Sequence, residues 1–374
     1  MPWLAWRNTI QDRSRLAATL TGIVFALVLV AIQLGLFLGF TETTSNIIDH
    51  SGVSLWVCGR GVPYFDVGSS LPERRVYQIL QVPGVLSAEK LIVRFSTWKR
   101  PDGGEETIEI VGFPTGETGG APWDIVAGRI DDLRQDAAVM IDESYRTKLG
   151  VDQLGQTVEI HGRRARVTGF THGIRSFTTA PFVFTSYRNA LDFTGLAEDQ
   201  TIYVLVRAQS GVDPAALRDR IRASVPSIDV FTTEEFSRKT RFYWMFTTGA
   251  GIALLIAAVM GFAVGTAVVA QTLYGATMDR LREYGALKAI GASNTYVCLL
   301  VAKQASIVAI AGYAVAFGVS ALAIRVAQNT GAPIVFPRQV AALLLAMAFV
   351  MSLGGSVFSI RRALSVDPSL VMKL

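Results

Sequence analysis

The chain has 374 residues, of which 51% are hydrophobic and only 17% are charged. About a quarter of the residues of a soluble protein are charged, so this composition argues against a wholly water-soluble protein. The charge is also uneven, because residues 41–241 hold 26 of the 30 acidic and 23 of the 35 basic side chains. We therefore expect one soluble domain with a net charge near −3, joined to membrane helices whose net charge is near +8.

The chain begins with a basic segment and an apolar run. Residues 1–16 include Arg7, Arg13 and Arg15, and we expect them to form a cytosolic amphipathic helix. Residues 17–40, "AATLTGIVFALVLVAIQLGLFLGF", are long enough for the roughly 20-residue helix that crosses a bilayer. Their apolar part exceeds the roughly 7–15 residues of a signal peptide, and no Ala-x-Ala cleavage site follows. This run therefore predicts a first transmembrane helix that also acts as an anchor.

Residues 41–241 predict an extracytoplasmic domain that mixes helices and strands. Strand-like alternation occurs in "LIVRFSTW", "TIEIVGF" and "TIYVLVRA", and "QTVEIHGRRARVTGF" predicts a hairpin that turns near His161 and Gly162. In "DPAALRDRIRASV", Asp213 is placed to cap a helix and Pro214 to occupy its first position. A second helix is expected in "PERRVYQIL", and "RPDGGEE" predicts an exposed hairpin tip.

Residues 242–278 predict a stalk and the second transmembrane helix. They contain 37 residues without a charge, which as one helix would be about 55 Å long at 1.5 Å per residue, against a bilayer core of about 30 Å. The excess length predicts a helical stalk that joins the domain rigidly to the membrane. The sequence "FYWMF" at its start is typical of an aromatic collar at the membrane interface.

Two glycine pairs indicate close helix packing. Gly35 and Gly39 form a G-x-x-x-G motif in the first span, and Gly261 and Gly265 form another in the second. Such pairs let two backbones approach closely, so they favour either a tight helix pair or a seam between two copies of the chain. Each motif alone also occurs by chance in helices rich in Gly and Ala.

Residues 279–298 form a short polar loop that begins "DRLREYGALKAIGAS". We expect a short amphipathic helix with a charged side at Asp279, Arg282 and Glu283. Its apolar side is expected at Leu281, Tyr284, Leu287 and Ile290. Gly291 is placed to end this helix. Two interpretations stay open from the residues alone: a connecting helix lying at the membrane surface, or a peg that contacts a cytosolic partner and transmits its motion.

The rest of the chain predicts two more spans, at residues 299–324 and 339–360, separated by a short extracytoplasmic loop at 325–338. Residues 361–374 form a basic C-terminus. Basic side chains concentrate in the N-terminus, the loop at 279–298 and the C-terminus. Two predicted spans separate each of these segments from the next, so all three lie on the same side of the membrane. The positive-inside tendency makes that side the cytosol, although Arg325 and Arg338 weaken the bias. We expect a multi-pass inner-membrane protein with both termini in the cytoplasm.

Signals for chemistry are weak. The sequence has no G-x-x-x-x-G-K-[ST] motif, so it binds no nucleotide by that route. The three histidines, His50, His161 and His172, lack metal-ligand spacing. We expect no catalytic residue, no metal site, no cofactor and no nucleic-acid partner, and hence a chain that is not an enzyme by itself.

Several segments resemble the MacB/FtsX-type family of ABC transporter permeases. "REYGALKAIGAS" resembles the cytosolic signature of that family, "WRNTIQDRSRLAATLTGI" its entry helix and first span, and "RRALSVDPSLVMKL" its basic exit. "GRIDD", "AAVMIDESYRTKLGV" and "LGQTVEI" with "RVTGF" are similar to its periplasmic pattern. Within the family, "GIVFALVLVAIQLG" is similar to DevC-type permeases, which lack a fused ATPase domain. The implied fold is four transmembrane helices with a large α+β extracytoplasmic domain inserted between helices 1 and 2.

The resemblance also implies a function. A separate cytosolic ABC ATPase would dock on the loop helix, two copies of the chain would form a homodimer, and mechanical transmission would move the periplasmic domains. A periplasmic adaptor protein and an outer-membrane channel would complete an exporter of a lipid-like or hydrophobic substrate. The residues that the resemblance places at the ATPase contact are Arg280, Arg282, Glu283, Tyr284, Leu287, Lys288, Ile290 and Gly291.

Two other classes remain as alternatives. One is an FtsX-like transmembrane signal transducer that activates a cell-wall hydrolase and transports nothing, although its outer domain is typically smaller than the block of about 200 residues here. The other is a membrane-anchored sensor or receptor without an ATPase. ATPase activity of the assembly separates the sensor from the rest, and stimulation of that activity by substrate separates a transporter from a transducer.

Overall fold

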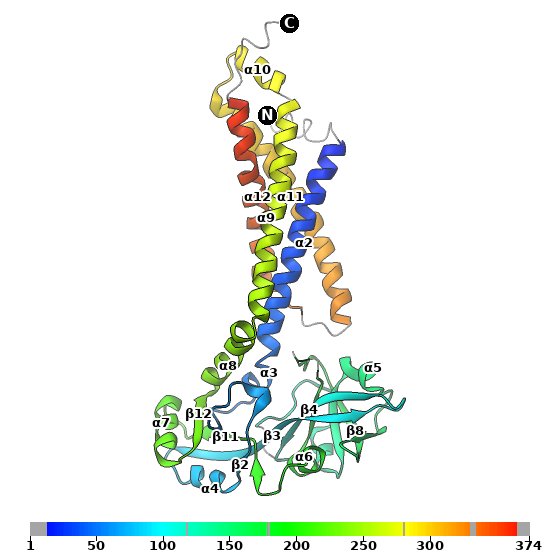
Figure 1. Cartoon of the computed structure of the whole chain (residues 1–374), viewed down its shortest axis with the longest axis vertical. Coiled ribbons are helices and arrows are strands. Elements are labelled where there is room, and N and C mark those ends of the chain that lie inside the picture. Colours follow the sequence, from blue (N-terminus) through cyan, green and yellow to red (C-terminus); the bar gives the residue numbers. More distant parts are fainter. Residues whose placement is uncertain are drawn as a thin grey trace. The chain divides into compact units, whose positions relative to one another are not determined.

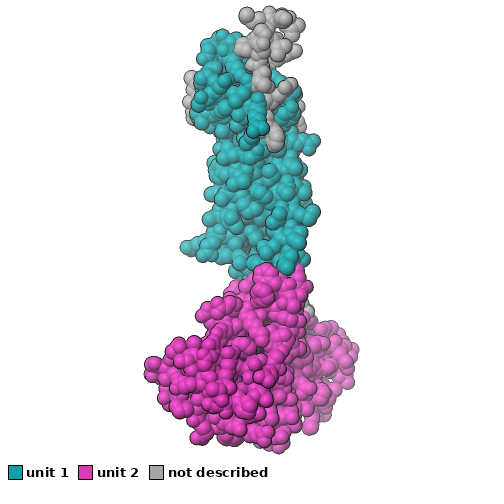
Figure 2. All heavy atoms as spheres, turned by 60° about the vertical axis from the view of Figure 1, so that its left-hand side comes forward, with its two compact units in different colours: residues 1–39, 251–374 teal, residues 40–250 magenta. Residues whose placement is uncertain are grey.

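The computed structural model describes residues 13–116, 119–176, 178, 180–279, 281–329 and 334–364. The chain divides into two compact units, residues 1–39 with 251–374 and residues 40–250 (Figures 1 and 2). The predictions made for residues 1–12, Arg280, residues 330–333 and residues 365–374 lie outside the described residues.

The first unit consists of long helices. These are α2 (Arg13–Thr43), α9 (Ala250–Asp279), α10 (Leu281–Ala289), α11 (Asn294–Asn329) and α12 (Arg338–Leu364). Within the described residues, four segments are long and apolar enough to cross a membrane, namely Leu16–Thr43, Ala250–Asp279, Asn294–Ala327 and Arg338–Arg361. The predicted fold class, four apolar spans with an α+β domain between the first and the second, is confirmed.

Helix α2 supplies much of the core of this unit. Its fully buried side chains recur at the spacing of one helix face and are Ile23, Ala26, Leu27, Val30 and Ala31. They pack against side chains of the other three long helices, including Val269, Val308 and Met351. The sequence of α2 is apolar on all sides, so this buried stripe is set by packing and not by amphipathicity.

The second unit is built around a ten-stranded mixed sheet with the order β12-β1-β11-β3-β4-β9-β6-β8-β5, and β7 pairs with β3 and β8. Its strands are β1 (Leu55–Gly59), β3 (Val85–Lys99), β4 (Glu105–Phe113), β5 (Ile125–Ala127), β6 (Ala138–Asp142), β7 (Thr157–Ile160), β8 (Arg163–Thr171), β9 (Phe182–Ser186), β11 (Tyr203–Ala208) and β12 (Ile228–Thr232). β2 (Leu71–Pro72) and β10 (Gln200–Thr201) form a separate pair. β4–β9 and β6–β8 pair in parallel, and the other pairs are antiparallel.

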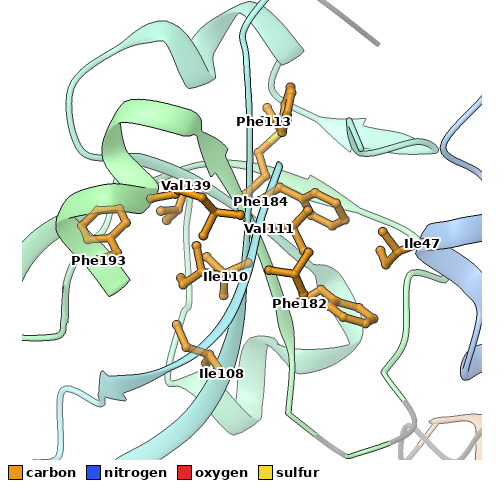
Figure 3. Close-up of a cluster of buried hydrophobic side chains, with 14 of the residues drawn as sticks. Ile47, Ile108, Ile110, Val111, Phe113, Val139, Phe182, Phe184 and Phe193 are labelled. Atoms are coloured by element: carbon orange, nitrogen blue, oxygen red, sulfur yellow. The ribbon is translucent and has the colours of Figure 1, made fainter. Parts of the chain in front are cut away.

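Short helices cover this sheet. The α-helices of the unit are α3 (Asn46–Asp49), α4 (Arg74–Leu80), α5 (Arg146–Leu149), α6 (Tyr187–Thr194), α7 (Pro214–Ser224) and α8 (Thr233–Phe242). Three 3₁₀ turns are η1 (Phe65–Val67), η2 (Ile130–Arg134) and η3 (Glu143–Tyr145). The larger core cluster joins β3, β4, β6, β8 and β9 to α6, and Figure 3 shows Ile110, Val111 and Phe184 within it. Ile47 of α3 packs into the same cluster.

A smaller core cluster lies between α4, α7 and the β1, β11 and β12 part of the sheet. Val57, Val204 and Val230 contribute from the strands, and Leu217 and Ile221 from α7. Leu217 and Ile221 are one helical turn apart, which places both on the inner face of α7.

The local predictions for this domain are confirmed. β7 and β8 are joined by His161 and Gly162, which have φ of 51° and 75°, the left-handed values of a tight hairpin turn. Asp213 accepts a hydrogen bond from Ala216 N (3.0 Å), and Pro214 is the first residue of α7. The strands predicted at residues 91–98 and 107–113 lie in β3 and β4, and the strand predicted at 201–208 corresponds to β11 from Tyr203 onward, with Thr201 in β10.

The prediction of one continuous helix through residues 242–278 is wrong. α8 ends at Phe242, a π-helical turn η4 follows at Tyr243–Thr247, and α9 begins at Ala250. Gly249 between them has φ of 78°, a left-handed value that cannot continue a right-handed helix. Of the aromatic residues in "FYWMF", Tyr243 and Trp244 pack onto the domain, whereas Phe242 and Phe246 are exposed.

Candidate functional site

The polar loop between α9 and α11 folds into α10, the candidate coupling helix. Two backbone hydrogen bonds close the C-terminal end of α10: Gly291 N donates to Lys288 O (3.0 Å) and Ala292 N donates to Leu287 O (2.9 Å). Gly291 has φ of 95°, so a residue without Cβ suits this position. Ser293 Oγ then accepts from Tyr296 N (3.2 Å) and caps α11. The sequence "GAS" therefore ends one helix and starts the next within a few residues.

Part of the predicted apolar side of α10 is buried against the chain's own helices. Tyr284 is 1% exposed and lies in a cluster with Val297, Leu300 and Val301 of α11. Leu287 is half-buried and packs against the same cluster. Lys288 Nζ donates to Leu364 O at the end of α12 (2.6 Å). These contacts tie α10 to two of the long helices.

The remaining side of α10 is open to solvent. Ile290 is 83% exposed, and Glu283 is also exposed. Ile290 directly follows the last residue of α10, and the described residues leave most of its side chain uncovered. Arg280 lies outside the described residues, and the side chain of Arg282 is likewise not described. The candidate site thus separates into a buried half at Tyr284 and Leu287 and an open half at Glu283 and Ile290.

The glycine pairs both lie in close contacts within the chain. A methyl group on Gly265 would lie 2.1 Å from Ala26 Cβ, and one on Gly261 would lie 2.7 Å from Leu29 Cδ2. Gly261 and Gly265 therefore hold α9 against α2, as the helix-pair interpretation requires. Gly35 is different, because a methyl group there would lie 2.8 Å from Ile334 Cγ2, and its carbonyl accepts from Val335 N (3.2 Å).

Gly39, the second glycine of the first pair, is buried. The first G-x-x-x-G pair thus has its described contact at Gly35, with the segment that precedes α12. Gly35, Gly261 and Gly265 each face a close contact within the chain, which accounts for these three small residues without a second copy. The seam between copies stays a prediction.

A set of polar contacts joins the two segments through which the chain enters and leaves the second unit; we call it the entry–exit clamp. Arg241 of α8 pairs with Asp49 of α3 (2.5 Å), and its Nε donates to Ser45 Oγ (2.7 Å). Trp244 Nε1 donates to Asp66 Oδ2 (3.3 Å). The ring of Tyr64 stacks on that of Tyr243 at 4.2 Å. The clamp could not be predicted from local sequence patterns, because its hydrogen-bonded partners are 178 to 196 positions apart.

Two buried carboxyl groups lie beside this clamp. Burial raises the pKa of Asp66, against hydrogen bonding from Trp244, which lowers it. Burial raises the pKa of Glu109 well above its usual value, and the charge of Asp66 adds to that shift. Glu109 is 0% exposed. Burial thus disfavours the charged form of both groups relative to water, and more strongly for Glu109.

Within the part of the chain that the structure describes, no group of three or more His, Cys, Asp or Glu side chains is arranged to hold a metal ion. The geometry instead describes a short helix with one buried and one exposed side, and a clamped domain inserted between the first two spans.

Comparisons with known proteins agree with this architecture. The family description "MacB-like periplasmic core domain" matches residues 16–224, and "FtsX-like permease C-terminal" matches residues 255–368. Two uncharacterized ABC transporter permeases of Mycobacterium tuberculosis are similar over nearly their whole length. One is 26% identical over 370 residues, covering 98% of this chain and 96% of the relative. The other is 25% identical over 380 residues, covering 99% and 98%.

Two solved structures are similar to part of the chain. The periplasmic region of MacB from Actinobacillus actinomycetemcomitans has a TM-score of 0.39 at 14% identity, covering 52% of this chain and 94% of that one. The extracellular domain of the noncanonic ABC-type transporter YknZ from Gram-positive bacteria has a TM-score of 0.34 at 17% identity, covering 48% and 98%.

Proposed function

Because the chain belongs to the MacB/FtsX-type family of ABC transporter permeases, we propose that it is the permease subunit of an exporter driven mechanically by a separate cytosolic ATPase. The family makes it a multi-pass inner-membrane protein and implies an ATPase partner and a dimer. The orientation, the contact residues, the transmission of motion and the substrate are the parts that we propose.

The single observation that supports the transmission is the two-sided environment of α10. Its open half, with Glu283 and Ile290, is the surface that we assign to the ATPase. Its buried half, with Tyr284 and Leu287, joins α10 to α11, so a displacement of α10 by the ATPase is passed to that helix. A loose surface loop would absorb the same displacement, because it lacks such contacts.

The proposed orientation puts α10 and both termini in the cytosol, following the basic side chains of the cytosolic segments. The domain at residues 41–241 then lies outside. Its entry–exit clamp makes it respond to the first two spans as a unit, because Arg241 and Asp49 connect the segments that continue from them. A lipid-like or hydrophobic substrate, a periplasmic adaptor protein and an outer-membrane channel complete the proposed machine.

The test is recruitment and stimulation of the cognate ABC ATPase, identified by a gene adjacent to that of the permease. Burial of an isoleucine side chain contributes about 1.5–3 kcal/mol, which corresponds to about ten- to a hundredfold in affinity. We expect Ile290→Asp to reduce co-purification of the ATPase and its turnover in lipid at least tenfold. We expect Glu283→Ala to weaken both as well, by an amount that depends on how deeply the partner buries the carboxylate.

The matched control is Glu105→Ala, an exposed acidic side chain at the start of β4. Ile290→Asp should leave the folding stability of the permease itself unchanged, since Ile290 is 83% exposed. Leu287→Asp is a poorer test because it would place a charge in the chain's own apolar cluster. Wild-type recruitment and turnover in both Ile290→Asp and Glu283→Ala would reject α10 as the coupling element. Turnover that no hydrophobic substrate stimulates would favour the signal transducer.

A further inference from the structure

A basic cavity of about 460 Å³ lies in the second unit between α7, β12 and α8. It is lined by Arg218, Arg222, Phe231, Glu235, Arg238, Lys239 and Phe242. Four cationic side chains thus face one carboxylate, and the lining has an excess positive charge. We call this cavity the α7–α8 groove.

Its single acidic side chain is already engaged. Glu235 accepts a hydrogen bond from Thr232 N (2.9 Å) as part of the cap of α8, and it also pairs with Arg218. Arg218 pairs in addition with Asp219 (2.8 Å). The charge of Arg218 is therefore compensated within the protein.

Arg222 and Lys239 are held differently. Arg222 donates to Val230 O and Lys239 donates to Val62 O, so backbone carbonyls and not carboxylates orient them. Among the described residues, no carboxylate oxygen lies within 4.0 Å of either charged group. Both cations lie over the ring of Phe231, at 4.5 Å for Lys239 Nζ and 5.6 Å for Arg222 Cζ. Arg222 and Lys239 are therefore held in position while their positive charges remain uncompensated and can bind an anion.

An apolar edge adjoins these cations. Phe242 lines the groove, is 60% exposed, and lies 5.0 Å from the ring of Phe246, which is 48% exposed. Two exposed phenylalanines in contact form an apolar patch, and such patches mark sites of interaction with a protein, a ligand or a membrane. The groove thus offers cations to an anionic group and an aromatic edge to an apolar one.

The position of this edge in the chain limits its distance from the bilayer. Phe246 precedes Ala250, the first residue of the second candidate span, by four residues. Four residues extend over at most about 14 Å, whatever their conformation. Phe246 is therefore within about 14 Å of the start of the second candidate span, on the side of the membrane that holds the second unit.

We propose that the α7–α8 groove binds the phosphate group of an anionic lipid from the leaflet that faces the second unit. Arg222 and Lys239 contact the phosphate, and Phe242 with Phe246 contact the glycerol and upper acyl region. Arg238, which pairs with the exposed Glu234 at 3.7 Å, adds positive charge at the rim of the groove. This inference requires that the chain spans a membrane, but it does not require transport. Its failure would therefore leave the proposed permease function as it stands.

The test measures lipid binding to the full-length chain in a neutral detergent by native mass spectrometry. The probes are dioleoyl phosphatidylglycerol, dioleoyl phosphatidylcholine and the soluble headgroup glycerophosphoglycerol. Arg238→Glu changes a side chain that is 69% exposed, and the matched control Arg163→Glu makes the same charge change at one that is 66% exposed on β8. Both variants should fold, since neither side chain is buried.

We expect the wild-type chain to prefer phosphatidylglycerol to phosphatidylcholine, and Arg238→Glu to lower the affinity for phosphatidylglycerol about tenfold, with no change in Arg163→Glu. Phe242→Ser should weaken lipid binding and leave headgroup binding unchanged. Equal affinities in Arg238→Glu and Arg163→Glu, or no preference for the anionic lipid, would overturn the proposal. A headgroup that binds as tightly as the lipid would show that the groove takes a soluble phosphate ester, and the lipid assignment would be wrong.

Discussion

Replacing Gly265 with alanine adds a single methyl group at the closest contact between α9 and α2. That methyl group would lie 2.1 Å from Ala26 Cβ and 2.6 Å from Met351 Cε. Met351 can move because its methyl group ends a flexible side chain, whereas Ala26 Cβ is fixed to the backbone of α2. The contact with Ala26 therefore decides the outcome.

The size of the effect follows from that distance. Real Cβ contacts are rarely closer than about 3.4 Å, so the two helices must separate by roughly 1.3 Å at this point. Overpacking of this kind typically costs about 1–3 kcal/mol. Alanine gains about 1 kcal/mol over glycine in helix propensity, which offsets part of that cost. We expect Gly265→Ala to destabilise the chain by up to about 2 kcal/mol, and by about 1–3 kcal/mol relative to a Gly→Ala change that meets no neighbouring atom.

The assay is reversible unfolding of the purified chain in mixed micelles, with particle mass measured in parallel. Gly318→Ala in α11 is the matched control, because a methyl group there would meet no atom within 4 Å. It should be neutral or slightly stabilising. Ala26→Gly removes the opposing methyl group and should restore most of the stability when it is combined with Gly265→Ala, as a double-mutant cycle would measure.

Two results would refute this reasoning. If Gly265→Ala is as stable as Gly318→Ala, the α2–α9 contact does not have the described geometry. If Gly265→Ala splits a dimer while the stability of the single chain is unchanged, the glycines form the seam between copies that the sequence left open.

Three further predictions concern orientation, the helix break and pH. In a chain with Cys298→Ser, a thiol reagent that cannot cross membranes should label a cysteine at the exposed position Glu198 but not one at Ser293. Burial raises the pKa of Cys58 to about 12, so this native thiol stays unreactive. Equal labelling of the two introduced cysteines in intact cells would contradict the orientation. Gly249→Ala should lower the unfolding free energy by about 1–2 kcal/mol, because the φ of 78° at this position strains a residue that has a Cβ atom. A methyl group there would meet no atom within 4 Å, so a steric clash does not contribute. An unfolding midpoint equal to that of wild type would contradict this backbone strain. Because the pKa of Glu109 is raised on folding, its contribution to stability is complete below its usual pKa of 4.5 and is lost as pH rises through the raised value. Relative to wild type, Glu109→Gln should therefore gain unfolding free energy as pH rises, and a difference that is constant with pH would count against the shift.

Features that depend on neighbouring residues could be predicted from the sequence. The four apolar spans follow from runs of uncharged residues, the cap of α7 from Asp213 and Pro214, and the turn at His161 from the glycine that follows it. Each of these features depends on residues that are close in the sequence, where backbone sterics and local hydrogen bonds allow few backbone conformations.

Features that depend on distant residues could not be predicted from the sequence. The aromatic sequence "FYWMF" predicts a collar on a continuous helix, but Trp244 bonds to Asp66 and Tyr243 stacks on Tyr64, which turns this segment toward the domain. The apolar side of α10 was visible in the sequence, yet which of its residues are buried depends on α11. Tyr284 is covered by that helix and Ile290 is not, although both are apolar.

The entry–exit clamp gives the domain the geometry of an inserted module. Arg241 and Asp49 are 192 positions apart, yet their charged groups are 2.5 Å apart, so the chain leaves and returns through adjacent points. An insert with adjacent ends can be lengthened, shortened or exchanged by recombination without altering the segments that flank it. A short flexible linker from Ser45 to Arg241 would accordingly bypass the whole insert and leave the apolar helices connected in their original order. Diversification of such proteins can therefore proceed in the insert while the helices that flank it are retained.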